Sequence, residues 1–149
     1  MTNALVAALH FIGVFGVIAT VFAEWVIFNP IPTVAEARRL QRCDAWYGLS
    51  ALLVMAAGGL RVFYFEKGSA FYLGNPVFHL KMALFIGVGL LSIYPTVVFI
   101  RWRKATRSDT APTMPPEQAK RIALLLRLEV LLLVAMIVAA SIMAKGIGL

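Results

Sequence analysis

The chain is poor in charged residues and in cysteine. Only 14% of its 149 residues are charged, whereas 61% are hydrophobic. Soluble domains carry about 25% charged and roughly 45–50% apolar residues, so this composition excludes an ordinary soluble fold. The single cysteine, Cys43, excludes a disulfide within the chain and a paired-cysteine redox or zinc motif. We expect Cys43 to be an inert thiol.

Signatures of soluble enzymes are missing as well. The sequence has no phosphate-binding glycine loop, no dinucleotide-binding turn after a strand, and no plausible Ser-His-acid set. Its two histidines, His10 and His79, lack the further ligands that a zinc site requires. Hydrolytic, nucleotide-dependent and zinc-dependent chemistry are therefore disfavoured.

Long uncharged stretches dominate what remains. They cover residues 1–23, 45–60, 82–100 and 130–144, and residues 122–126 extend the last one backwards. A helix rises about 1.5 Å per residue and must cross roughly 30 Å of hydrocarbon, so each stretch can span a membrane once. The sequence predicts an all-α integral membrane four-helix bundle that forms a single transmembrane domain over residues 1–149. The expected helices lie at about 3–28, 34–65, 76–104 and 117–145.

The expected helix ends carry their usual signals. Asn29-Pro30-Ile31-Pro32 stops the first helix because proline cannot continue the hydrogen-bond ladder. Thr33 and Glu36 have the spacing of a capping box at the start of the second helix. Pro76 suits the first turn of the third helix, and Pro115-Pro116-Glu117 leads into the fourth.

Lysine and arginine are distributed unevenly over this pattern. Most lie in the first and third connections and the adjoining helix ends: Arg38, Arg39, Arg42, Arg101, Arg103, Lys104, Arg107, Lys120, Arg121 and Arg127. The positive-inside rule places that side in the cytoplasm and both termini outside, in the periplasm of a bacterial inner membrane. The net charge of +7 is then a topology signal, and attraction to anionic lipid of the bilayer explains it better than a nucleic-acid partner.

His10 and His79 begin two apolar segments on the same side of the membrane. An imidazole in hydrocarbon is costly unless it has a partner, so two at matching depth indicate a site. Ligation of a haem b iron between two helices needs only two imidazoles. We therefore predict His10 and His79 as haem ligands in the outer half of the bilayer. Gly13 beside His10 leaves room for a flat group; alternatively, it only lets two helices approach closely.

Three further residues are candidates for the haem environment. Arg61 lies at the level of the histidines and suits a haem propionate, or equally Glu66 or a lipid phosphate. Lys81 also suits a propionate, although it points away from His79 and a lysine near the interface normally snorkels to water. Met82 shares a face with His79 and is either a soft axial ligand or packing.

Charged residues also gather at the inner helix ends. Glu24, Arg39, Asp44 and Glu129 are expected at similar depth. A salt-bridge cluster that fixes the helix ends is the favoured interpretation, and a proton path or inner ligand site is the alternative.

Two resemblances to membrane-protein families are carried by particular residues. The run LRVFYFEKGSAFYLGNPVFHLKMALF at 60–85 and LLSIYPT at 90–96 are similar to a bacterial membrane-protein family catalogued as a domain of unknown function, over nearly the whole chain. More distantly, the four-helix plan resembles the HemJ-type protoporphyrinogen oxidases, through ALH at 8–10, HLK at 79–81, EV at 129–130 and Lys145. That resemblance implies a haem-dependent redox role with His10 as ligand. Glu24-Trp25 and Leu131 depart from its pattern.

Two functions are consistent with these features. The first is a small membrane b-type cytochrome that transfers electrons or oxidises a porphyrinogen or a quinol. The second is a cofactor-free membrane transport, assembly or accessory subunit. A homodimer is compatible with either, because small residues allow close helix approach: Gly58, Gly59, Gly87 and Gly89.

Overall fold

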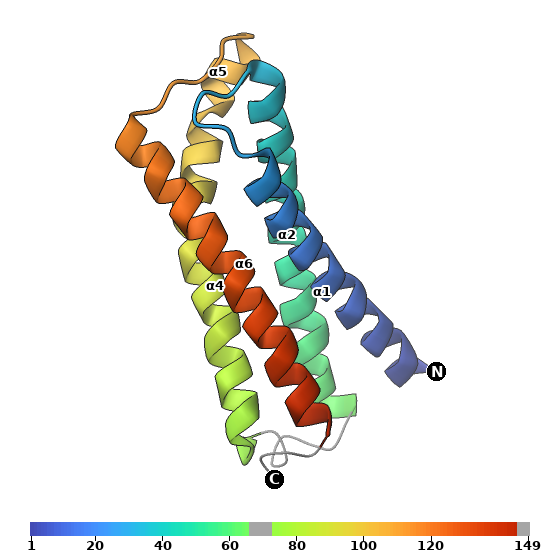
Figure 1. Cartoon of the computed structure of the whole chain (residues 1–149). Coiled ribbons are helices and arrows are strands. Elements are labelled where there is room, and N and C mark those ends of the chain that lie inside the picture. The colour runs from blue at the N-terminus through green and yellow to red at the C-terminus, as the bar shows by residue number, and fades with distance from the viewer. Residues whose placement is uncertain (66–72, 146–149) are drawn as a thin grey trace.

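The computed structural model describes residues 1–65 and 73–145, and over these ranges it contains helices and no strand (Figure 1). The elements are α1 (Thr2–Ile27), α2 (Val34–Leu60), the π-helix η1 (Arg61–Phe65), α4 (Pro76–Arg101), α5 (Arg103–Arg107) and α6 (Pro116–Ala144). Four helical segments, α1, α2 with η1, α4 with α5, and α6, are long and apolar enough to cross a membrane. The predicted all-α four-helix membrane architecture is confirmed; the location of the termini stays a prediction.

Local signals in the sequence set the helix starts. The Thr33 hydroxyl accepts a 3.2 Å hydrogen bond from the Glu36 amide, and the Glu36 carboxylate accepts one of 2.7 Å from the Thr33 amide. The predicted capping box is therefore present. Asn75 caps α4 by accepting a 2.8 Å hydrogen bond from the Val77 amide, with Pro76 in the first turn. These bonds satisfy amides that have no partner inside the helix.

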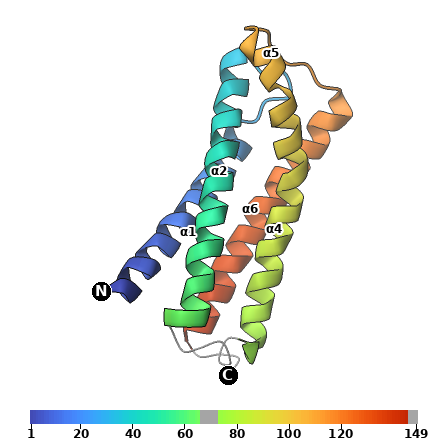
Figure 2. The same ribbon diagram turned by 180° about the vertical axis from the view of Figure 1, so that it is seen from behind.

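The helices are arranged so that each lies beside those that precede and follow it in the chain. α1 packs on α2, α2 on α4, α4 on α6, and α6 on α1, whereas the backbones of the diagonal pairs α1 and α4, and α2 and α6, do not approach each other closely in the described residues. The α1/α2 and α4/α6 pairs are the most extensive. Toward its N-terminus α1 diverges from the bundle in both views (Figures 1 and 2).

Small residues bring α1 and α2 together. A methyl group added at Gly16 would collide with Oγ of Ser50, and one added at Gly13 would lie 2.9 Å from Cγ2 of Val54. Real side chains do not approach so closely, so α2 already occupies the space beside the two glycines. This is the close approach that glycine permits between membrane helices.

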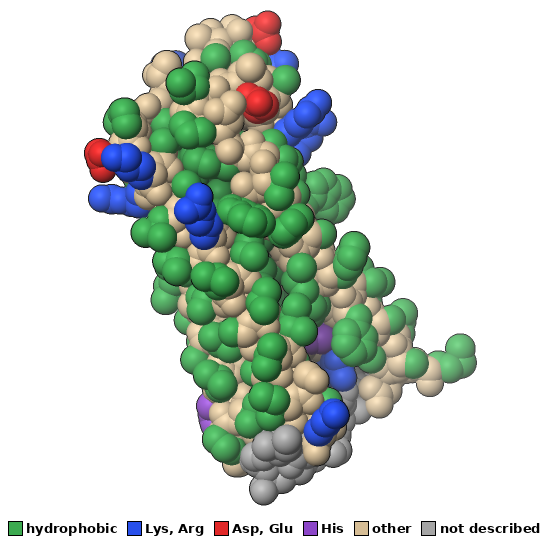
Figure 3. Space-filling model, viewed as in Figure 1, with side chains coloured by type: hydrophobic (Ala, Val, Ile, Leu, Met, Phe, Trp, Pro, Cys, Tyr) green, Lys and Arg blue, Asp and Glu red, His purple; other side chains and the backbone are tan. Residues whose placement is uncertain are grey.

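Two apolar clusters fill the interior along the bundle axis. The basic-end cluster comprises Ala37, Leu40, Val98, Phe99, Trp102, Ile122 and Leu126. The central cluster comprises Val17, Val21, Tyr47, Val88 and Leu133, from all four long helices. The outer surface between the ends is mostly apolar, whereas most lysine and arginine side chains on the face shown gather at one end, which we call the basic end (Figure 3). An apolar exterior is what lipid contact requires.

Candidate functional site

A polar layer separates the two apolar clusters. Its residues come from all four long helices and are Glu24, Asp44, Tyr47, Ser92, Thr96 and Glu129. Helical periodicity places them there. On α6, Glu129 follows Leu126 of the basic-end cluster and precedes Leu133 of the central cluster, each by about one turn. On α2, Asp44 lies between Leu40 and Tyr47 in the same way.

The three carboxyl groups of this layer are deeply buried. The exposed fraction is 3% for Glu24, 8% for Asp44 and 1% for Glu129. Glu24 lies within electrostatic reach of both Asp44 and Glu129, and Glu129 within reach of Asp44. Three helices, α1, α2 and α6, thus direct acidic side chains into one small volume. Because each charge buried there would repel the others, the layer strongly favours fewer than three charges.

Hydroxyl groups from α4 and α2 complete the layer. The Thr96 hydroxyl donates a 2.5 Å hydrogen bond to Oδ1 of Asp44. The Tyr47 hydroxyl donates to Oγ of Ser92 at 2.9 Å, and Ser92 donates in turn to the Gly89 carbonyl at 2.9 Å. Pro95 lies inside α4 at this level, where it cannot donate the usual helical hydrogen bond. The layer therefore combines proton-carrying groups with a helix whose backbone ladder is interrupted.

The carboxyl groups of Glu24 and Glu129 do not use their full hydrogen-bonding capacity among the described residues. Oε1 of each is buried and lacks a hydrogen-bond partner among the described residues. Within the same residues none of the three carboxyl groups forms an ion pair; the surface pairs Arg38–Asp109 and Lys120–Glu117 lie elsewhere. A buried polar atom without a partner costs about 1–3 kcal/mol, so its presence in two facing side chains suggests a function.

The predicted inner charged cluster is thus only partly assembled. The structure brings Glu24, Asp44 and Glu129 together, whereas Arg39 lies on the exposed surface of α2. The favoured interpretation, a salt-bridge cluster, does not describe this arrangement. The helical phase of α2 turns Asp44 inward and Arg39 outward, and the role predicted for the cluster stays a prediction.

The two histidines occupy different surroundings. His10, on α1, is half-buried, and its ring lies against Gly58 of α2, where an added methyl group would approach Nδ1 to 3.3 Å. His79, on α4, is exposed, and its Nε2 lies 2.9 Å from the Leu73 carbonyl oxygen. The backbones of α1 and α4 do not approach each other closely in the described residues, and ligation of one haem by both imidazoles stays a prediction. Gly13, which is predicted to leave room for a flat group, is covered by α2.

The remaining predicted haem contacts are also dispersed. The Arg61 guanidinium carbon lies 5.4 Å from the Phe11 ring centroid, a cation–π arrangement between η1 and α1. Lys81 is half-buried and Met82 is 38% exposed, both on α4. Glu66, the alternative partner of Arg61, lies outside the described residues. The roles predicted for these side chains stay predictions.

Sequence reasoning missed Tyr47, Ser92 and Thr96. Signals for them exist: Asp44 and Tyr47 share a face of α2, and Ser92 and Thr96 share a face of α4. Hydroxyl residues are common in membrane helices, however, and only the packing of α2 against α4 shows that these two faces meet.

Comparison with known proteins identifies a family. The model of a family described as "Predicted membrane protein (DUF2214)" matches residues 2–148. No curated protein and no solved structure matches the chain significantly.

Proposed function

The chain belongs to the DUF2214 family of predicted membrane proteins, and from this membrane setting we propose that it transports protons through its polar layer. The observation that carries the proposal is the pair Glu24 and Glu129. Each has a buried carboxyl oxygen without a hydrogen-bond partner in the described residues. Ionisable residues inside membrane bundles are rare, and those that persist commonly mark ion paths or proton relays.

The surroundings favour protons over metal ions as the transported species. Among the described residues no group of three His, Cys, Asp or Glu side chains is placed to hold a metal ion. A carboxyl group instead carries a proton without needing further ligands. The neutral form avoids the cost of burying a charge, and the charged form arises transiently when the proton leaves.

The hydroxyl residues have a defined part in this function. Thr96 donates to Asp44, which holds that carboxyl group against α4. Tyr47 and Ser92 form a second hydrogen-bonded pair between α2 and α4. A proton released by Glu24 or Glu129 can be accepted by a neighbouring carboxyl group. Thr96 holds the Asp44 carboxyl group in position, and the Tyr47–Ser92 pair joins α2 to α4 at this level. The layer therefore binds and releases protons between the two apolar clusters.

Proton flux into lipid vesicles tests the proposal. The purified protein is reconstituted into vesicles that contain a pH-sensitive dye, and a potassium gradient with valinomycin supplies the driving potential. We expect acidification above that of protein-free vesicles. Glu24→Gln and Glu129→Gln should each reduce it to the background leak, because an amide cannot release a proton under these conditions.

A matched control separates this effect from a general loss of charge. Glu117 is on the same helix as Glu129, but its side chain is 84% exposed and pairs with Lys120 at the surface. Glu117→Gln should retain the flux of the original protein. Equal flux in all variants, or none above background in the original protein, would refute proton transport.

Haem b remains a second candidate, supported by the half-buried His10 at the α1/α2 contact and by the HemJ-type resemblance. In this proposal His10 is the haem ligand, the substrate is a quinol or a porphyrinogen, and a second subunit of a homodimer is an additional source of contacts. Absorbance spectra of protein expressed with haem supply, oxidised and then reduced with dithionite, test it. The absence of a Soret band removes this candidate.

A further inference from the structure

A pocket at the basic end differs from the polar layer in the sign of its charge, although Arg103 of its wall lies within electrostatic reach of Asp44. It has a volume of about 400 Å³ and is lined by Arg38, Gln41, Arg103, Thr106 and Arg107. Three of these five described residues are arginines and none is acidic. The pocket lies where the beginning of α2 meets α5, beyond the basic-end apolar cluster that includes Trp102.

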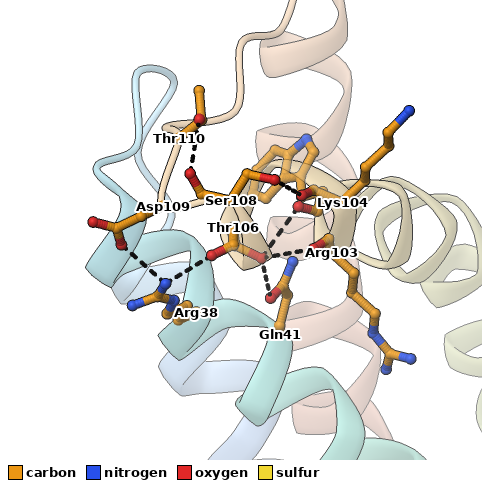
Figure 4. Close-up of polar contacts among 9 residues, drawn as sticks. Arg38, Gln41, Arg103, Lys104, Thr106, Ser108, Asp109 and Thr110 are labelled. Atoms are coloured by element: carbon orange, nitrogen blue, oxygen red, sulfur yellow. Dashed lines mark hydrogen bonds and ion pairs between the residues drawn. The ribbon is translucent and has the colours of Figure 1, made fainter.

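Hydrogen bonds fix the walls of the pocket. Nη2 of Arg38 donates to the Thr106 carbonyl at 2.7 Å and to Oδ1 of Asp109 at 3.0 Å (Figure 4). Gln41 uses both ends of its amide, donating to the Phe99 carbonyl at 2.9 Å and accepting from the Thr106 hydroxyl at 3.3 Å. These bonds attach α2 to the end of α4 and to α5, so the pocket exists before any ligand arrives.

The charge on α5 is not balanced. This helix of five residues, RKATR, contains Arg103, Lys104 and Arg107 and has no acidic residue. Arg103 and Arg107 are about one turn apart, a spacing at which like charges destabilise a helix. Among the described residues neither forms an ion pair, and the Arg103 side chain extends away from the hydrogen-bond network (Figure 4). Two guanidinium groups on the pocket wall are thus available to an anion.

We propose that this pocket binds a phosphate group. Arg103 and Arg107 supply exposed cationic contacts, and Arg38, which is held by its two hydrogen bonds, forms a fixed wall. The planar guanidinium fork matches two phosphate oxygens at once, which favours phosphate over a compact monovalent anion. The phosphate belongs either to an anionic lipid headgroup or to a soluble phosphate compound. This inference is independent of proton transport.

The test compares two double variants that remove the same charge. Arg103→Gln with Arg107→Gln changes residues that line the pocket. Arg101→Gln with Lys104→Gln changes exposed residues of the same end that do not line it. All proteins are purified in a maltoside detergent, which contains no phosphate. Calorimetric titration with inorganic phosphate measures soluble binding, and native mass spectrometry with added phosphatidylglycerol measures retained lipid. Unchanged circular dichroism confirms that each variant is folded.

The two arms distinguish the source of the phosphate. Loss of at least about tenfold in phosphate affinity in the pocket variant alone supports a soluble ligand, because the variant removes charged hydrogen bonds to the phosphate oxygens. Selective loss of retained phosphatidylglycerol in that variant supports a lipid headgroup. Equal losses in both variants indicate diffuse attraction and overturn the proposal, as does an original protein that binds neither probe.

Discussion

The hydroxyl group of Tyr47 donates a 2.9 Å hydrogen bond to Oγ of Ser92, and this bond joins α2 to α4 at the depth of the buried carboxyl groups. Tyr47 is 8% exposed and also belongs to the central apolar cluster. The residue therefore connects apolar packing to the polar layer.

Tyr47→Phe should weaken this connection. The variant keeps the ring in the central cluster and removes only the hydroxyl, while Ser92 retains its bond to the Gly89 carbonyl. We expect a loss of about 1 kcal/mol in the free energy of unfolding, which is typical of one hydrogen bond. Thermal unfolding in detergent measures it. Tyr64→Phe is the control, since Tyr64 is 77% exposed and its variant should unfold like the original protein.

Thr96→Val should be more costly than Thr96→Ser. Valine has nearly the shape of threonine but cannot donate to Asp44, so a buried carboxyl group loses its hydrogen-bond partner. We expect a destabilisation of about 1–3 kcal/mol. Serine keeps the donor and should restore most of the stability. Urea unfolding monitored by circular dichroism compares the two, and similar midpoints would show that the bond contributes little.

Glu129→Leu should stabilise the fold while abolishing proton flux. The substitution removes a buried carboxyl oxygen that has no partner in the described residues and fills the space with apolar atoms. A gain of about 1–3 kcal/mol is expected, since the desolvation cost of the unpaired atom disappears. Thermal unfolding and vesicle acidification are measured on the same preparation. A less stable variant would mean that Glu129 supports the packing of α6.

Gly16→Ala should disturb the α1/α2 contact. The added methyl group would collide with Oγ of Ser50, so the helices must separate or Ser50 must rotate. Overpacking of this kind costs about 1–3 kcal/mol. Gly48→Ala on α2 is the control, because a methyl group there meets no described atom within 4 Å, and it should be neutral or slightly stabilising. Differential scanning fluorimetry in detergent compares the two midpoints.

Sequence patterns predict the helices of this protein well but not how their faces meet. The uncharged stretches, the Thr33 capping box and Pro76 are local signals, and the structure contains the helices that they indicate. Which helices become neighbours in the bundle is not determined by local sequence signals. Equal depth predicts that His10 and His79 share a site, and this stays a prediction. Depth alone does not show that their helices lie diagonally in the bundle. The diagonal placement of α1 and α4 is set by the packing of all four helices.

In the candidate site, too, the sequence predicts the depth of residues but not the direction in which their side chains point. The sequence predicts that Glu24, Asp44 and Glu129 lie at one depth, because each borders the inner end of an uncharged stretch. Whether each points inward depends on the rotation of its helix about its own axis. That rotation follows from how Gly13 and Gly16 fit Ser50 and Val54, and from similar contacts elsewhere. Such shape matching has no simple signature in one sequence.

The apolar clusters on either side of the polar layer determine the kinetics of any transport through it. Leu40, Phe99, Ile122 and Leu126 are fully buried on one side, as are Val21 and Val88 on the other. Fully buried apolar side chains on both sides of the layer exclude water from their positions. Protons can therefore cross only when the bundle rearranges, so the protein should work as a carrier with turnover. Its rate should saturate with driving force and fall steeply on cooling, unlike the current through an open pore.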